Sequence, residues 1–91
     1  MKNETEVRTL IEILRFRIER DEKAAFECDQ QQRECQRIYQ DCGTMNHQRQ
    51  MENQIVDLGK MKIAYKKDIK KWQKMLEIES GFLVHLLKQK E

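Results

Sequence analysis

The 91-residue sequence has no proline, three glycines and no long hydrophobic run. Because proline removes a backbone donor and clashes with the preceding turn, its absence leaves long helices uninterrupted. The densest apolar stretch, residues 82–87, is far shorter than the ~20 residues that a membrane-spanning helix needs. No apolar segment follows the first residues, Met1 to Glu4, so we expect no secretory signal peptide.

Patterns typical of catalysis and metal binding are also missing. His47 and His85 lie far apart, and there is neither a Cys-x2-Cys pair nor a glycine-rich phosphate loop. Cys28, Cys35 and Cys42 follow at steps of seven, which on one helix separates neighbours by ~10.5 Å along the axis. That distance is too long for a disulfide or for one zinc ion. We therefore expect buried, reduced cysteines in an intracellular compartment (cytoplasm or nucleus), no catalytic, cofactor or metal site, and no enzyme.

Charged residues, in contrast, make up 37% of the chain, and their net charge is only +2. Glutamine, glutamate, lysine and arginine are strong helix formers, because their long side chains lose little freedom in a helix. A proline-free chain of this composition with a regular apolar period is typical of coiled coils, whereas a disordered chain keeps no period. The near balance of charge does not by itself indicate a nucleic-acid partner.

Residues that are mostly apolar recur at alternating steps of four and three in both halves of the chain, at the d and a positions of a heptad. The first run is Val7, Ile11, Leu14, Ile18, Asp21, Ala25, Cys28, Gln32, Cys35, Tyr39 and Cys42. The second run is Met51, Ile55, Leu58, Lys62, Tyr65, Ile69, Trp72, Leu76, Glu79, Leu83 and Leu86. Further apolar residues at the adjoining g positions widen both stripes, which favours a hairpin or bundle over a bare two-stranded seam: Leu10, Ala24, Ile38, Met61, Met75 and Phe82.

The two runs differ in phase by two residues at Asp41-Cys42-Gly43-Thr44. A continuous coiled coil usually absorbs insertions of three or four residues, so this offset indicates a turn. Gly43 suits the left-handed position after a helix, and Thr44 suits the cap of the next one. At the other end, Asn3 and Glu6 have the spacing of a capping box.

The sequence thus predicts one all-α unit over 1–91, with a helix at 4–41, a turn at 42–45 and a helix at 46–90. The predicted fold is a long antiparallel helical hairpin, a coiled coil that oligomerises into a helical bundle. The alternative is a continuous parallel two-stranded coiled coil.

Two charged residues in the seams, Asp21 and Lys62, distinguish between possible pairings. In a parallel dimer each would face its own copy and repel it. In one antiparallel register they face each other, and Val7 then lies opposite Leu76. The next register, one heptad further on, sets each charge against a neutral side chain. We therefore predict the register that pairs Asp21 with Lys62.

That register leaves residues 78–87 of the second helix without a partner in the chain. An unpartnered apolar cluster marks a contact site, so we predict partner binding by Phe82, Leu83, Val84, Leu86 and Leu87. The expected function is that of a non-catalytic scaffold or assembly subunit, bound to its own copy or to another helical protein.

The alternative function depends on residues 60–74, which contain seven lysines and one aspartate. Such a tract could bind nucleic acid or another anionic partner through outward lysines: Lys66, Lys67, Lys70, Lys71 and Lys74. Three features disfavour nucleic acid. Tyr65 and Trp72 fall on the seam rather than on the surface. The tract contains no arginine, which is the better fork for phosphate. We also expect acidic residues of the first helix to neutralise part of its charge.

Overall fold

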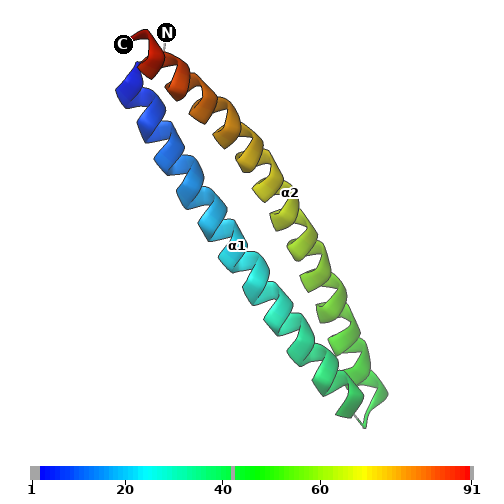
Figure 1. The fold of residues 1–91 in the computed structure, drawn as a ribbon. Coiled ribbons are helices and arrows are strands. Elements are labelled where there is room, and N and C mark those ends of the chain that lie inside the picture. Colours follow the sequence, from blue (N-terminus) through cyan, green and yellow to red (C-terminus); the bar gives the residue numbers. More distant parts are fainter. Residues whose placement is uncertain (1–2, 42, 91) are drawn as a thin grey trace.

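Two helices account for nearly the whole chain in a computed structural model that describes residues 3–41 and 43–90. They are α1 (Glu4–Asp41, 38 residues) and α2 (Met45–Gln89, 45 residues). The helices run antiparallel and side by side, so that both chain ends lie together (Figure 1). The molecule measures 70 × 14 × 14 Å. The chain is therefore all-helical and elongated, as predicted, and it forms a hairpin within one chain rather than a continuous helix.

The start of α1 has the capping residue predicted from the sequence. The backbone N–H of Glu6 donates to Asn3 Oδ1 at 2.9 Å, and the N–H of Val7 donates to the Asn3 carbonyl at 3.0 Å. Glu4 and Glu6 lie in the first turn, where a carboxylate is favoured by the positive end of the helix dipole. Thr44 precedes α2 in an extended conformation, but its side chain makes no capping hydrogen bond.

The left-handed conformation expected at Gly43 is not found, because no described glycine has a positive φ. A β-carbon at Gly43 would also meet no atom within 4 Å. The prediction of a left-handed Gly43 is therefore wrong. Cys42, the first residue of the predicted turn, lies outside the described residues.

The seam between the helices occupies the predicted heptad positions. On α1 the buried side chains are all at d and a positions: Val7, Ile11, Leu14, Ile18, Asp21, Ala25 and Cys28. On α2 only Met51 is buried, and the other seam positions from Ile55 to Leu86 are half-buried. A layer only two helices wide leaves part of its own seam accessible to water.

The register differs from the predicted one by about one heptad. The indole Nε1–H of Trp72 donates to Asp21 Oδ2 at 3.1 Å, whereas the predicted register set Trp72 opposite Ile11. The side-chain amide of Gln32 donates to the carbonyl of Ile55 at 3.1 Å, rather than lying opposite Met51. Residues of α1 thus lie next to residues of α2 that are later in the sequence than predicted.

The predicted ion pair between Asp21 and Lys62 is consequently wrong. Lys62 Nζ lies 3.0 Å from Asp29 Oδ1 and 3.1 Å from Gln32 Oε1. A lysine can keep its stem in the seam while its ammonium reaches the edge. Asp21 is satisfied by Trp72 instead, so each charge has its own partner.

The observed register also packs one more heptad of apolar side chains against α1. Val7 is fully buried, and Ile11 lines the same hollow as Leu83. The ammonium of Lys90 contacts the carboxylate of Glu4, so the last turn of α2 reaches the first turn of α1. Burying apolar surface stabilises by about 25 cal/mol per Å², whereas a buried ion pair contributes little net stability. The extra apolar contacts therefore explain why this register is preferred.

Candidate interaction surface

The predicted C-terminal contact cluster lies on α2 beside the beginning of α1. Its members are Phe82, Leu83, Val84, Leu86 and Leu87. The prediction that α2 extends beyond α1 here is wrong, because the first turn of α1 reaches this level. Val84 and Leu87 nevertheless remain 52% and 37% exposed, while the other three are half-buried. Partner binding by this cluster stays a prediction, now centred on its two exposed members.

A second apolar surface follows one side of the seam. In an antiparallel pair, the g positions of both helices border the seam on the same side. Six of them are apolar and are called the apolar flank below: Leu10, Ala24, Ile38, Met61, Met75 and Phe82. Ile38, Met61 and Met75 are 38%, 46% and 40% exposed, and the other three are half-buried. The sequence showed these residues as a widened stripe, and the hairpin covers them only in part.

Towards the turn, the apolar flank opens into a groove of about 470 Å³ between the helices. Its walls include Gln31 and Ile38 from α1 and Gln54 and Met61 from α2, with the seam residues Cys35 and Leu58 between them. All four wall residues occupy g positions. The groove thus demonstrates that the g positions of the two helices share one side of the hairpin.

The opposite side, formed by e positions, is largely polar and includes Arg8, Arg15, Glu22, Asp29 and Lys66. Asp29 forms ion pairs with Lys62 at 3.0 Å and with Arg33 at 3.2 Å. The hydrogen bond from Lys62 holds the pKa of Asp29 below its ordinary value, and Arg33 adds to the effect. The two sides of the seam therefore differ in chemistry.

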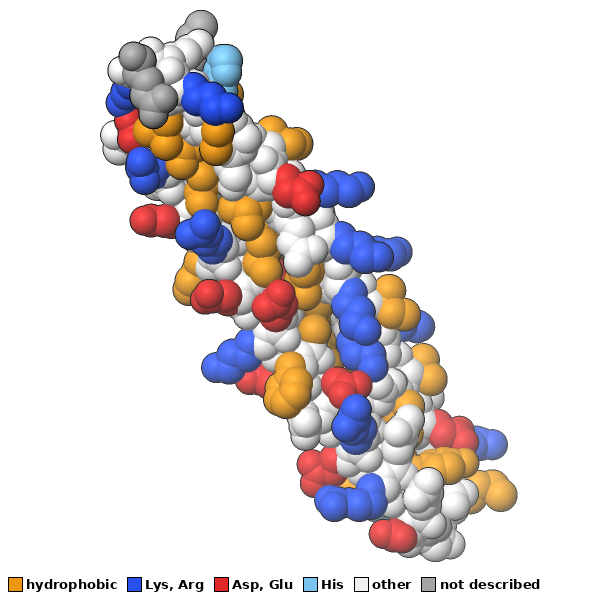
Figure 2. All heavy atoms as spheres, in the orientation of Figure 1, with side chains coloured by type: hydrophobic (Ala, Val, Ile, Leu, Met, Phe, Trp, Pro, Cys, Tyr) orange, Lys and Arg blue, Asp and Glu red, His pale blue; other side chains and the backbone are white. Residues whose placement is uncertain are grey.

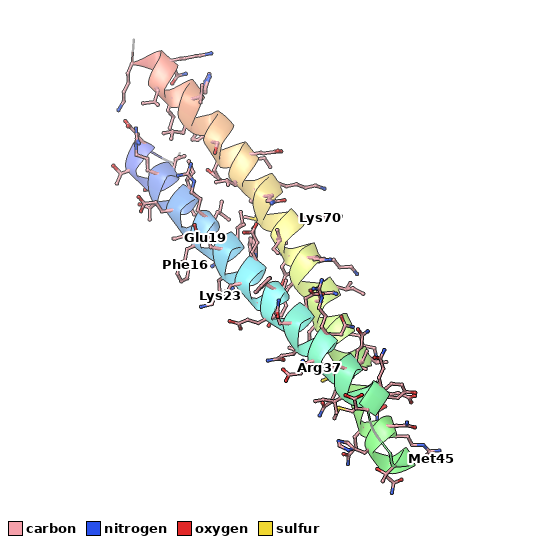
Figure 3. The ribbon with its side chains drawn as sticks, turned by 60° about the horizontal axis from the view of Figure 1, so that its bottom comes forward. Phe16, Glu19, Lys23, Arg37, Met45 and Lys70 are labelled. Carbon is pink, nitrogen blue, oxygen red and sulfur yellow. The ribbon has the colours of Figure 1, made fainter. Side chains whose placement is uncertain are left out.

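Figure 2 shows one long face of the hairpin, with acidic and basic side chains projecting from both helices. A line of hydrophobic side chains runs between the helices in the half that carries the termini. Phe16 is one of the exposed large hydrophobic residues, with 65% of its area accessible. Phe16 lies on the side of α1 that faces away from α2 (Figure 3).

The predicted anion-binding lysines, all exposed, are Lys66, Lys67, Lys70, Lys71 and Lys74. Lys70 lies on the outer side of α2 (Figure 3). Within residues 3–41 and 43–90, none of the five forms an ion pair with a carboxylate. Among the lysines of residues 60–74, Lys62 forms an ion pair with α1 through Asp29, and the charge of Lys66 also helps to lower the pKa of that carboxyl.

Trp72 is half-buried in the seam rather than free to stack on a base. The Arg17 guanidinium lies 4.8 Å and Lys71 Nζ 5.3 Å from the centroid of its ring. Both distances are within the range of cation–π attraction. The indole N–H is occupied by Asp21, a bond that sequence reasoning missed although a buried tryptophan usually needs an acceptor.

Near the turn, polar side chains connect the helices. The Tyr39 hydroxyl donates to Glu52 Oε1 at 3.0 Å, and Cys35 Sγ lies 3.4 Å from Gln54 Oε1. The hydrogen bond to Glu52 raises the pKa of Tyr39. These pairs were not predicted, because the heptad pattern records apolar positions and carries no information about polar partners.

Cys28 is buried, Cys35 is half-buried, and both are free thiols. Cys42 lies outside the described residues. Among those described, no group of histidine, cysteine and carboxylate side chains could hold a metal ion. The same part of the chain contains no helix that is long and apolar enough to cross a membrane.

The geometry defines a structural class, the long two-helix hairpin, but no family. Comparisons with protein-family models, with curated proteins and with solved structures found no match to this chain. The functional argument therefore depends on the surfaces of the hairpin itself.

Proposed function

We propose that this chain is a non-catalytic scaffold or assembly subunit that mediates protein–protein interaction and oligomerisation in an intracellular complex. The main support is apolar surface that a two-helix seam leaves uncovered, at the apolar flank and at Val84 and Leu87. Uncovered apolar surface of this kind marks protein contacts. The partner is a second copy of the chain or another helical protein.

A non-catalytic role also fits the shape of the molecule. Catalysis usually requires a concave site that excludes water and gathers several reactive groups. A hairpin 14 Å across offers mainly shallow hollows between its helices. A reducing intracellular compartment fits the free thiols of Cys28 and Cys35.

The contact role of the C-terminal cluster is tested by Val84→Glu with Leu87→Glu. Both side chains are exposed, so the helix content measured by circular dichroism should change little. Self-association in sedimentation experiments, or binding to a helical partner, should be lost. Phe16→Glu is the control, because Phe16 is exposed and faces away from α2. Unchanged association of the double variant would remove this cluster from the proposal.

The alternative function, binding of nucleic acid or another anionic partner, is supported by the unpaired lysines of α2. Replacing Lys67, Lys70, Lys71 and Lys74 with glutamine should then abolish salt-sensitive binding to heparin and to single-stranded RNA. The control is Lys23→Gln with Arg37→Gln, which removes two exposed cations from α1 (Figure 3). Equal loss in both variants would indicate a nonspecific effect of net charge and would reject a lysine site on α2.

A further inference from the structure

We propose that the apolar flank is the docking surface for a second copy of this chain, in an antiparallel twofold dimer. The two hairpins face each other through their flanks, and the turn of one lies at the open end of the other. Each α1 then packs on the α1 of the copy and each α2 on its α2, which makes a four-helix bundle. This inference rests on the proposed function and names its partner and its surface.

The chain exposes more surface than a compact monomer of its mass would, which is consistent with such an interface. A folded monomer of 11.1 kDa is expected to expose about 5,700 Å², whereas this chain exposes 7324 Å². The difference is about 1,600 Å², and a standard interface buries about 800 Å² on each partner. A contact along most of the flank would thus bring the exposed area closer to that of a compact protein.

The order of residues along the flank favours a copy of the same chain. The g positions of α1 are Leu10, Arg17, Ala24, Gln31 and Ile38. This row has the order apolar, polar, small, polar, apolar, which is the same in both directions. An antiparallel twofold contact centred on Ala24 sets Leu10 against Ile38 of the copy and Arg17 against Gln31 of the copy. The small Ala24 then meets its own copy, where two helices can approach closely.

The corresponding row of α2 has the same symmetry at the same level. Asp68 lies midway between Met61 and Met75, seven residues from each. Gln31 and Met61 line one groove and so lie at about the same level of the hairpin. One heptad away from the turn on each helix, Ala24 is therefore level with Asp68. A single twofold axis at this level can therefore relate both rows to those of the copy. On α2 it pairs Met61 with Met75 of the copy.

A parallel twofold dimer, with both turns at one end, fits less well. It would place α1 on α2 of the copy and thus set Arg17 against Met75 and Ala24 against Asp68. Charged groups would then face apolar or small side chains across a contact that excludes water. In the antiparallel dimer, Arg20 of one copy instead meets Glu27 of the other on the rim, and this pair occurs twice. The antiparallel arrangement brings Asp68 against its own copy, and on the same rim it sets Glu6 of one chain against Asp41 of the other.

The first experiment is sedimentation equilibrium over a range of concentrations. The wild-type chain should form a dimer, and Ile38→Glu with Met61→Glu should be monomeric with unchanged helix content. The control, Val56→Glu with Ile63→Glu, replaces two apolar residues of α2 that are 54% and 56% exposed and lie outside the flank. It should remain dimeric. A monomeric wild type, or a dimer equally sensitive to both pairs of changes, would overturn the inference.

The second experiment tests the orientation of the copies. Gln31→Glu should lower the dimer Kd by roughly 2- to 10-fold, because it faces Arg17 of the copy twice per dimer. Gln31→Lys should raise the Kd by a similar factor. Within one chain the two residues lie about 21 Å apart along α1, so they cannot pair there. The control variants Gln36→Glu and Gln36→Lys change the opposite side and should leave the Kd unchanged. Equal responses at positions 31 and 36 would reject the antiparallel contact.

Failure of this inference can be separated from failure of the proposed function. If the flank variant still self-associates while Val84→Glu with Leu87→Glu does not, the copy docks elsewhere, and the scaffold function stands without this surface. If the Asp68→Asn variant, which removes the facing like charges, does not form a tighter dimer than wild type, the proposed centre of the contact is wrong. If neither pair of changes affects association with any helical protein, both proposals fail.

Discussion

The two charged residues of the seam, Asp21 and Lys62, each have their own hydrogen-bond partners and do not bond to each other. Asp21 is buried, accepts the indole hydrogen bond of Trp72 and has Arg20 Nε at 3.6 Å. Lys62 is bonded to Asp29 and Gln32. Among the described residues, no buried side-chain nitrogen or oxygen lacks a partner. The two charges are therefore independent, and changes at one should not be compensated at the other.

We expect Trp72→Phe to destabilise the hairpin by about 1–3 kcal/mol, because the buried Asp21 carboxylate loses a donor. The free energy of unfolding is measured by urea titration followed by circular dichroism. In an Asp21→Ala background the same change should cost less, and a double-mutant cycle isolates the coupling. Lys62→Met serves as the control, since its effect should add to that of Trp72→Phe. Coupling as strong to Lys62 as to Asp21 would contradict the observed pairing.

Tyr39 provides a test of the polar contacts near the turn. Its pKa is raised by the hydrogen bond to Glu52, so the folded state favours the protonated phenol. The contribution to stability is therefore fully present below the ordinary tyrosine pKa of about 10 and is lost as pH rises through the folded value. In a Tyr65→Phe background, absorbance at 295 nm should show ionisation above the ordinary pH, and Glu52→Gln should move it back. An unchanged titration after Glu52→Gln would exclude this hydrogen bond in solution.

At the scale of the helices, the sequence predicts most of the fold. Period and composition predict two helices, and the four-and-three steps identify the seam positions that are buried from Val7 to Cys28. The predicted register is wrong because it depends on a pair between Asp21 and Lys62 that does not form. Such a pair contributes little net stability, and Lys62 can reach the edge of the seam. Counting the apolar layers, including Leu83 and Leu86, would have favoured the observed register.

Alanine substitutions at the two glycines of α2 test how tightly the helices pack at each position. Gly81→Ala should stabilise the hairpin by about 1 kcal/mol, because alanine favours a helix interior and a β-carbon there meets no atom within 4 Å. Gly59→Ala should gain less, because its β-carbon would lie 3.2 Å from Gln32 Nε2. Making room would weaken the hydrogen bonds of Gln32 to Ile55 and Lys62. Thermal unfolding compares the two variants, and equal gains would mean that the Gln32 contacts contribute nothing.

For the whole molecule, the candidate surface was only partly predictable. The g residues of the apolar flank were visible in the sequence, but their position on one side of the seam follows from the antiparallel packing. Conversely, the C-terminal cluster was predicted from an overhang that the true register removes. Both outcomes have one cause: which side chains stay uncovered depends on the register, and the register is a property of both helices together.

The hairpin and its register can be measured by pulsed electron resonance with spin labels at Thr5 and Lys88, which are exposed near the open end. The axes of packed helices are about 10 Å apart, so we expect a label separation of roughly 30 Å or less once the flexible arms are included. One continuous helix would separate the same residues by about 125 Å, at ~1.5 Å per residue. Dilution with unlabelled chain removes contributions between copies. In the predicted register, Lys88 would instead lie about nine residues, roughly 14 Å, beyond the end of α1. A second label pair at Arg33 and Arg49 is offset along the axis by about eight residues, roughly 12 Å, in the observed register, but by about one residue in the predicted register. The second distance should therefore be longer in the observed register than in the predicted one. A long first distance combined with a short second distance would contradict the structure.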